Sequence, residues 1–260
     1  MNTMRTLLFA SMLAAGAFHS ATAAETTTPV SKPSGTTVVL VHGAFADGSS
    51  WGKLIPLLQA KGLKVVAVQN PLTSLADDVS FANRVIDAQT GPVVLVGHSW
   101  GGTVITEAGV NDKVKALVYV AAFAPSTGET SLDGVKDYPA SPGLASPIAT
   151  SDGFLTLSPE TVAKEFAQDV TADEANLIAT TQGAVRGRNF EEKVTVAAWQ
   201  SKPSWYIVAD NDHMIQPDAQ RAFAKKIKAT TTSLPTSHVP MVSRPKDVAD
   251  VIAAAAKSLD

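Results

Sequence analysis

The feature that most constrains the fold is a serine, Ser99, between two glycines in the stretch Gly-His-Ser-Trp-Gly at residues 97–101. The apolar run at residues 92–96 has the composition of a buried strand, and the residues after the serine have the pattern of a helix. Glycines let the two backbone arms of a strained turn pass closely, which would lift the hydroxyl clear of a sheet. Because small residues at such a turn can also serve packing alone, the pattern needs support from elsewhere in the chain.

A second apolar run predicts the loop that would stabilise an oxyanion. Residues 38–41 are continuous Val and Leu, as in a parallel strand buried on both faces, and a small polar loop follows. A loop of this kind supplies one backbone N–H donor, and the residue after the nucleophile supplies the other. These donors would be the N–H groups of Ala44 and Trp100. A phosphate-binding loop is excluded because Ser49 stands where the required lysine would be.

Four of the five histidines have other expected roles. His19 lies in a segment that we expect to be removed, and His42 is expected to order the oxyanion loop through hydrogen bonds. His98 lies inside the turn, where its side chain should leave the strand in a different direction from that of Ser99. His213 is expected to be a solvated loop residue. His238, which follows the predicted strand Thr230–Leu234, therefore remains as the general base.

Two aspartates compete for the acid that would orient this histidine. Both follow the predicted strand Ser204–Ala209, in the sequence Asp210-Asn211-Asp212. Asp212 lies two residues further from the strand and is favoured, because the acid must reach back to the imidazole. Asp210 is interpreted as the former of an Asx-type turn.

Four segments resemble the corresponding segments of the α/β-hydrolase superfamily: HGAFADGSSW, GHSWGG, ADNDHMIQP and SHVPMVSRP. They are most similar to its branch of small serine esterases, which includes plant methylesterases, hydroxynitrile lyases and bacterial relatives. The resemblance implies a mostly parallel sheet with helices on both faces. It also implies that the aspartate shortly ahead of a proline is the acid, which matches Asp212, although this chain has Gln216 where the proline usually stands. The lyases have threonine and lysine where this chain has Gly43 and Val239, and both departures indicate hydrolysis.

The N-terminal residues predict export. Residues 1–24 have the pattern of a signal peptide, with basic Arg5, an apolar core at 7–18 and small residues at 21–24. The apolar core is too short for a comfortable membrane span, so no stable membrane anchor is expected. The chain has no cysteine for a lipid anchor, a disulfide or a metal site. We therefore predict a periplasmic or secreted protein.

The remaining residues predict one enzyme domain, with a linker at 25–35 and the domain at 36–260. The net charge is −3 without a basic cluster, so no nucleic-acid partner is expected. No paired-histidine metal spacing occurs either, which predicts chemistry without a metal or another cofactor. The expected partner is a small-molecule ester.

Strands and helices alternate along most of the domain, which predicts a parallel sheet covered on both faces. Strands are expected at residues 63–68 and 116–122. A helix is expected at 75–89, with Leu75, Val79, Ala82 and Ile86 toward the core. Residues 126–203 interrupt the alternation and are predicted to form an inserted helical cap, with helices near 159–168 and 172–182.

Aromatic side chains of two regions are candidates for an apolar pocket over Ser99, and cap packing is the alternative for those in the predicted cap. They are Phe45, Phe154, Phe166, Phe190 and Trp199. Arg186 and Arg188 could hold a substrate carboxylate or be solvated. Together these features predict an exported serine carboxylesterase for small to medium apolar esters, with Ser99 as the nucleophile, His238 as the base and Asp212 as the acid of a catalytic triad. The alternatives are carbon–carbon lyase or perhydrolase chemistry with the same triad, or a ligand-binding protein without activity.

Overall fold

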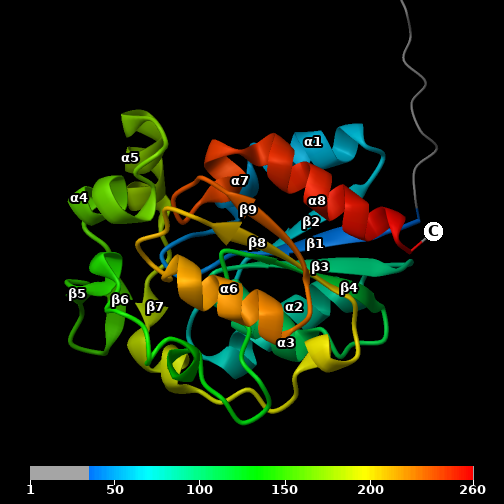
Figure 1. The fold of residues 1–260 in the computed structure, drawn as a ribbon, viewed down its shortest axis with the longest axis horizontal. Coiled ribbons are helices and arrows are strands. Elements are labelled where there is room, and N and C mark those ends of the chain that lie inside the picture. The colour runs from blue at the N-terminus through cyan, green and yellow to red at the C-terminus, as the bar shows by residue number, and fades with distance from the viewer. Residues whose placement is uncertain (1–34, 260) are drawn as a thin grey trace, which may run out of the picture. The chain divides into compact units, whose positions relative to one another are not determined.

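The computed structural model describes residues 35–259, so the predicted signal peptide and nearly all of the predicted linker lie outside the described residues. A central sheet has the strand order β2-β1-β3-β4-β8-β9, and all of its neighbouring strands are parallel (Figure 1). The strands are β1 (Thr37–Val41), β2 (Lys64–Val68), β3 (Val93–His98), β4 (Val114–Val120), β8 (Ser204–Ala209) and β9 (Thr230–Leu234).

The inner strands consist of apolar, mostly β-branched residues because helices cover both of their faces. Every residue of β1 and β3 is buried, whereas the Thr-rich strand β9 lies at the edge and is mostly exposed. The strands predicted at Ser204–Ala209 and Thr230–Leu234 are confirmed as β8 and β9. A residue that directly follows β3, β8 or β9 therefore lies at one edge of the sheet, where the carboxyl ends of the strands meet.

Helices pack on both faces of the sheet, which confirms the predicted layers (Figure 1). The helices α1 (Leu54–Ala60) and α8 (Pro245–Lys257) lie together on one face. The other face carries α2 (Leu75–Asp87), α3 (Trp100–Ala108) and α6 (Pro217–Lys226). Of the four α2 residues expected in the core, Val79 is only half-buried, and the neighbouring Asp78 is fully buried instead.

The residues predicted as a cap, 126–203, fall between β4 and β8. They contain the two expected helical segments, the first as α4 (Pro159–Thr161) and a π-helical turn η4 (Val162–Phe166), the second as α5 (Ala172–Thr181). They also form a small antiparallel sheet that was not predicted, because its strands are too short to show a pattern: β5 (Ile148–Ala149), β6 (Phe154–Thr156) and β7 (Val185–Arg186). The small sheet of this insertion and its helices α4 and α5, green in Figure 1, lie toward the carboxyl ends of the strands.

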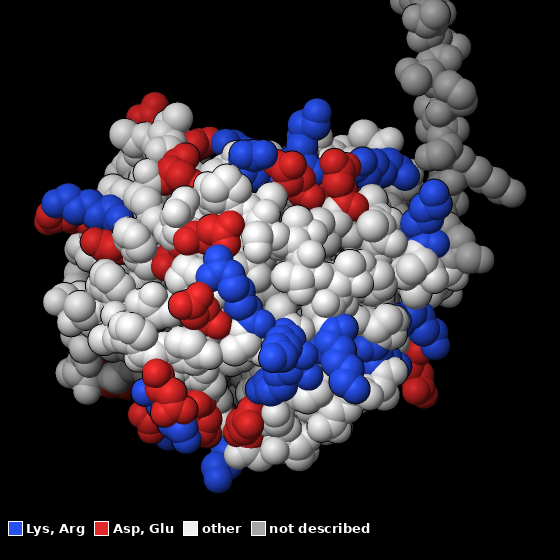
Figure 2. Space-filling view, in the orientation of Figure 1, with Lys and Arg blue, Asp and Glu red and all other residues white. Residues whose placement is uncertain are grey.

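Short helical turns complete the described chain. They are η1 (Gly48–Trp51), η2 (Leu132–Gly134), η3 (Pro142–Leu144), η5 (Gly187–Glu191), η6 (Ala198–Gln200) and α7 (Pro240–Ser243). Figure 2 shows acidic and basic side chains mixed over one face of the molecule. Among the helices of residues 35–259, none has the length and apolar character needed to cross a membrane.

Candidate active site

The backbone at Ser99 has the strained geometry that the glycine pattern predicts. Ser99 joins β3 to α3 with a φ of 53° and a ψ of −120°, a region that residues other than glycine rarely adopt. A Cβ atom on Gly97 would lie 2.4 Å from the carbonyl oxygen of Gly101, and one on Gly101 would lie 2.5 Å from that of Val41. Only glycines therefore allow the strand, the turn and β1 to approach so closely. The Ser99 residue is 7% exposed at the apex of this turn.

The loop after β1 lies directly against the serine. A Cβ atom on Gly43 would be 2.7 Å from the Cβ of Ser99, so this approach also requires glycine. In residues 35–259, the N–H groups of Ala44 and Trp100 donate no hydrogen bond. One of these free donors is on the adjacent loop and the other is on the residue after Ser99, which is the arrangement that an oxyanion hole requires.

His42 orders this loop, in the role that the sequence predicts. Its Nδ1 donates to the carbonyl of Gly43 at 2.9 Å, and its Nε2 accepts the N–H of Asn70 at 2.9 Å. Burial lowers the pKa of His42, which favours the neutral imidazole that these two bonds need. The side chain of Asn70 also donates to the carbonyl of His42 at 3.0 Å. The loop is therefore held from both sides.

Asp212 and His238 form a buried hydrogen-bonded pair. Asp212 Oδ2 lies 2.7 Å from His238 Nδ1, and the two side chains are 0% and 1% exposed. Asp212 Oδ1 accepts the backbone N–H groups of Met214 at 2.6 Å and Ile215 at 3.0 Å. Gln220 of α6 donates its Nε2 to Asp212 Oδ2 at 2.7 Å. These donors stabilise the carboxylate away from water and fix the direction in which it faces the imidazole.

Asp210 has a different environment, and its expected role in an Asx-type turn is wrong. Its carboxylate accepts a hydrogen bond from Arg221 of α6 at 2.6 Å and is partly exposed. The turn-forming bonds to the backbone two and three residues on are those of Asp212. Gln220, which holds Asp212, is a site residue that sequence reasoning missed. It lies at the end of the first turn of α6, and its position in the sequence carries no local signal for a contact with Asp212.

His98, the residue directly before Ser99, contacts the predicted base His238. Its Nε2 donates to the backbone carbonyl of His238 at 2.8 Å, and the two ring centroids are 4.7 Å apart. Burial lowers the pKa of His98 well below its ordinary value, so the ring is neutral. The side chain packs against His238 and links the strand that carries the serine to the loop that carries the base.

The three residues predicted as a triad therefore meet at one edge of the sheet. Ser99 follows β3, Asp212 follows β8 and His238 follows β9. Ser99 Oγ and His238 Nε2 each lack a hydrogen-bond partner in the described part of the chain. The bond between a nucleophile and its base is often long in an enzyme without substrate, and the imidazole leaves Nε2 open because Nδ1 faces Asp212.

A buried carboxylate on α2 supports the residue after Ser99. Asp78 is 0% exposed, and its carboxylate accepts the indole N–H of Trp100 at 2.7 Å and the backbone N–H of Leu72 at 2.8 Å. Burial raises the pKa of Asp78 to about 6. Sequence reasoning missed this residue, although an aspartate on the apolar face of a predicted helix is a signal for a buried polar contact.

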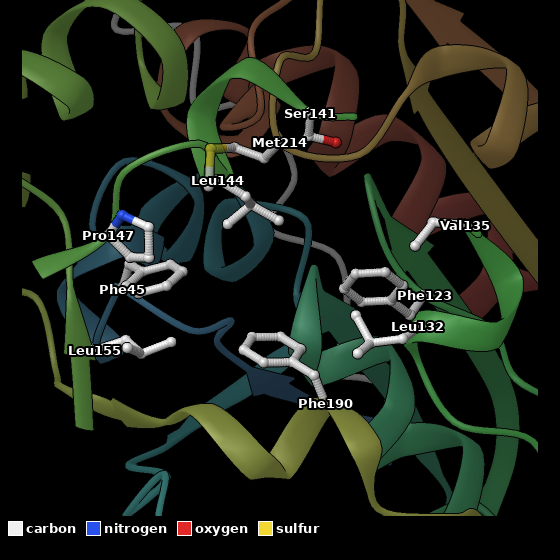
Figure 3. Close-up of a pocket in the computed structure, with 10 residues that line it drawn as sticks. All are labelled: Phe45, Phe123, Leu132, Val135, Ser141, Leu144, Pro147, Leu155, Phe190 and Met214. Atoms are coloured by element: carbon white, nitrogen blue, oxygen red, sulfur yellow. The ribbon is translucent and has the colours of Figure 1, made fainter. Parts of the chain in front are cut away.

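An apolar pocket of about 170 Å³ lies beside the turn (Figure 3). The side chains in Figure 3 surround one space, with Phe45 and Leu155 on one side and Phe123 and Leu132 on the other. A narrow space of about 20 Å³ is lined by Ala44 and Ser99 and shares five residues with the pocket: Phe45, Phe123, Leu144, Phe190 and Met214. The serine thus lies at the end of an apolar chamber.

Two of the five candidate pocket residues, Phe45 and Phe190, line this chamber. The others, Phe154, Phe166 and Trp199, are not among its lining residues. Phe166 packs on the ring of His238 at a centroid distance of 5.1 Å, and Trp199 donates its indole N–H to the carbonyl of Pro125. Phe154 is a half-buried residue of β6 whose neighbour Leu155 lines the chamber instead. Arg186 and Arg188 also lie outside the lining set.

Several lining residues were not predicted, because they come from the loop after β4, from short turns and a short strand of the insertion, and from the loop after β8. They are Phe123, Leu132, Val135, Ser141, Leu144, Pro147, Leu155 and Met214. Residues 35–259 contain no cluster of three or more His, Cys, Asp or Glu side chains that could hold a metal ion.

Comparisons with known proteins agree with this architecture. The chain is 29% identical over 240 residues to a probable hydrolase of Phoma sp., covering 83% of this chain and 96% of that protein. It is 26% identical over 250 residues to Methylesterase 8 of Arabidopsis thaliana, covering 84% and 88%. The second similarity confirms the predicted resemblance to plant methylesterases, and together these relatives support hydrolase activity.

The fold also matches the crystal structure of a pyrethroid hydrolase from Sphingobium faniae. The TM-score is 0.73 at 23% sequence identity, and the match covers 86% of this chain and 98% of that one. At this level of identity the match concerns the fold. The sequence profile of the alpha/beta hydrolase family matches residues 38–251, which include all three residues of the predicted triad. The chain therefore belongs to the alpha/beta hydrolase family.

Proposed function

We propose that this protein is an exported serine carboxylesterase that cleaves small to medium apolar esters through an acyl-enzyme. The observation that carries the proposal is the buried pair of Asp212 and His238, which leaves an open imidazole nitrogen at the sheet edge that also carries Ser99. The two free N–H groups beside Ser99 support the same reading. The similarity to a methylesterase supports an ester as the substrate.

The proposed reaction proceeds in two halves. Ser99 Oγ attacks the ester carbonyl while His238 Nε2 takes its proton, and the N–H groups of Ala44 and Trp100 stabilise the oxyanion. The intermediate collapses, the alcohol leaves with the proton from His238, and the acyl group stays on Ser99. Water then attacks the acyl-enzyme, again giving its proton to His238, and the acid is released as Ser99 is reprotonated. Asp212 holds the imidazole and stabilises its charged form throughout.

The chamber favours apolar substrates. Nine of its ten lining residues are apolar, Ser141 is the exception, and none of the ten is charged. A space of about 170 Å³ suits an acyl or alcohol group of small to medium size rather than a polymer. Desolvation of an apolar ester group in such a chamber supplies binding energy without a charged contact.

The test is Ser99→Ala, assayed on esters of graded chain length and with a fluorophosphonate probe. We expect kcat to fall by about four to six orders of magnitude while the protein remains folded. The probe should label the parent but not Ser99→Ala. Ser151→Ala is the matched control, because Ser151 is exposed and lies outside the lining set of the chamber, and it should label like the parent. Turnover that survives in Ser99→Ala would refute the mechanism.

Export is the second part of the proposal, and it rests on the signal-like residues 1–24. Mass spectrometry of protein produced in a Gram-negative host should find a mature N-terminus near Ala24 or Glu25 in the periplasm or medium. An intact Met1 in the cytoplasmic fraction would contradict export and leave the esterase proposal standing.

A further inference from the structure

One short segment of the insertion contacts both loops that carry the predicted acid and base. This segment is residues 165–169, which include the end of the π-helical turn η4. The acid loop, residues 210–216, follows β8, and the base loop, residues 235–239, follows β9. Four side chains of the segment reach these two loops.

Asp169 and Phe166 contact the base loop. The carboxylate of Asp169 accepts both the backbone N–H of Ser237 at 2.9 Å and its hydroxyl at 2.5 Å. Ser237 directly precedes His238 and is 0% exposed. The ring of Phe166, 1% exposed, packs edge-on against the imidazole of His238 at a centroid distance of 5.1 Å. The backbone before the base and the base itself are therefore both held from the insertion.

Gln168 and Glu165 contact the acid loop. Gln168 Nε2 donates to the backbone carbonyl of Asn211 at 2.7 Å, directly before Asp212. Glu165 Oε2 lies 2.7 Å from Nδ1 of His213, directly after Asp212. The acid is thus flanked on both sides in the chain by residues that the insertion holds.

The backbone of η4 helps to explain how one short segment reaches two loops. The N–H of Ala167 donates to the carbonyl of Val162 at 2.8 Å, a bond between residues five apart. Such a widened turn changes the direction of the side chains that follow it, and π-helical turns occur frequently at functional sites. The chain leaves the helix at Ala167, where φ is −139° and ψ is 45°, so Gln168 and Asp169 follow an irregular path.

We propose that residues 165–169 position the acid and the base, and that Asp169 is the positioning residue for His238, acting through Ser237. This inference rests on the proposed function, because it assigns a role in the same reaction. Asp169 touches no reacting atom. Its two hydrogen bonds set the backbone from which the imidazole projects, so an insertion that is not seated on the loops would leave the base misplaced.

The test compares Asp169→Ala with Asp169→Asn. Removing the carboxylate should lower kcat by about 10- to 100-fold, since a displacement of about 1 Å in a catalytic group has effects of this size. The KM for a small ester should change less than about threefold, because Asp169 is outside the chamber. Asp169→Asn should retain at least about a third of the parent kcat, because its amide oxygen can accept from the Ser237 N–H while its NH₂ donates to the Ser237 hydroxyl.

Two further variants show whether the effect is specific. Asp173→Asn, an exposed change on α5 of the same insertion, should leave kcat at the parent value. Ser237→Ala removes the hydroxyl partner of Asp169, so its effect on kcat and that of Asp169→Ala should be less than multiplicative in the double variant. All kcat values are divided by the fraction of protein with native near-UV circular dichroism, so that loss of folded protein does not count as loss of turnover.

A role in stability alone predicts a lower Tm for Asp169→Ala with a corrected kcat within twofold of the parent, and this result would overturn the inference. Asp169→Asn with as little activity as Asp169→Ala would also overturn it, because the charge and not the hydrogen-bond geometry would then be responsible. Failure of the proposed function is a separate result, recognised by turnover that persists in Ser99→Ala.

Discussion

The central sheet and the insertion contribute to the candidate site by different physical means. Ser99, Asp212 and His238 each follow a strand, so the register of β3, β8 and β9 places them at one edge. The insertion supplies chamber walls such as Leu132 and Leu155 from turns and a three-residue strand. These side chains depend on the paths of short turns and of a small sheet with two or three residues in each strand, rather than on the long parallel ladder of the central sheet.

This difference assigns the proposed chemistry to the sheet and the proposed selection of the substrate to the insertion. The groups proposed for the chemistry are fixed by elements that also form the core, so they change little unless the fold changes. The groups that would select the substrate lie on segments that can change in sequence and length without disturbing the sheet. The contacts of residues 165–169 are the exception, since they reach from the insertion to the loops of the sheet.

The largest effect apart from that of Ser99→Ala is expected on the sheet side, from the acid. Asp212→Asn should lower kcat by about 10⁴ with little change in Tm, because an amide cannot stabilise the imidazolium and disturbs its tautomer. Asp210→Asn is the matched control, since Asp210 contacts Arg221 and not the imidazole. It should keep kcat within about threefold, measured on the same ester. An inactive Asp210→Asn beside an active Asp212→Asn would show that the strand register does not set the chemistry.

A smaller effect is expected on the insertion side, and it should depend on the substrate. Leu132→Ala removes part of the chamber wall, so kcat/KM for esters with long apolar groups should fall by about five- to tenfold, while a short ester is turned over as before. Leu177→Ala, an exposed leucine of the same insertion that does not line the chamber, is the control. Equal losses for short and long esters would mean that the chamber does not select chain length.

The same division explains what the sequence could predict. The runs of Val and Leu in β1 and β3 and the polar residues that follow them are local patterns, and they lead directly to Ser99 and the loop of Ala44. The order of strands then brings Asp212 and His238 to the same place. No pattern marks β6, because a strand of three residues shows no periodicity, and the helix predicted near 159–168 gave no sign of the π-helical turn that ends at Phe166. Gln220 was missed because its contact with Asp212 is visible only in the fold.

Phe166 shows the limit most clearly. As an aromatic residue of the predicted cap, Phe166 was expected to line the pocket, but the π-helical turn directs its side chain onto the ring of His238. The general statement that the insertion covers the serine follows from the sequence, whereas the choice between Leu155 and its neighbour Phe154 as the chamber wall requires the structure.

The smallest effect on turnover is expected from Asp78, which joins the two regions. The Asp78 carboxylate accepts hydrogen bonds from the indole N–H of Trp100, on the sheet side, and from the backbone N–H of Leu72. The carbonyl of Leu72 in turn accepts hydrogen bonds from two groups of the insertion, Arg186 N and Asn189 Nδ2, each at 3.0 Å. Asp78→Asn should keep kcat within about threefold at pH 7.5, because the amide has nearly the same shape. Its main effect should appear in how the free energy of unfolding changes with pH.

Burial raises the pKa of Asp78 from 3.8 to about 6, so the folded protein binds more protons than the unfolded chain between these values. Its contribution to stability is therefore present at low pH and is lost as the pH rises through about 6. Asp78→Asn lacks this titration. The deficit in its free energy of unfolding relative to the parent should therefore shrink by about 2 kcal/mol from pH 4.5 to 7.5, measured by urea unfolding. Asp77→Asn is the control, because hydrogen bonds from Thr73 and Ser74 lower the pKa of Asp77 below 3.8, so this carboxylate is ionised in the folded and unfolded protein over this pH range and the deficit of Asp77→Asn should stay nearly constant. If the free energy of unfolding of Asp78→Asn falls short of the parent value by the same amount at both pH values, the Asp78 carboxylate does not titrate in this range.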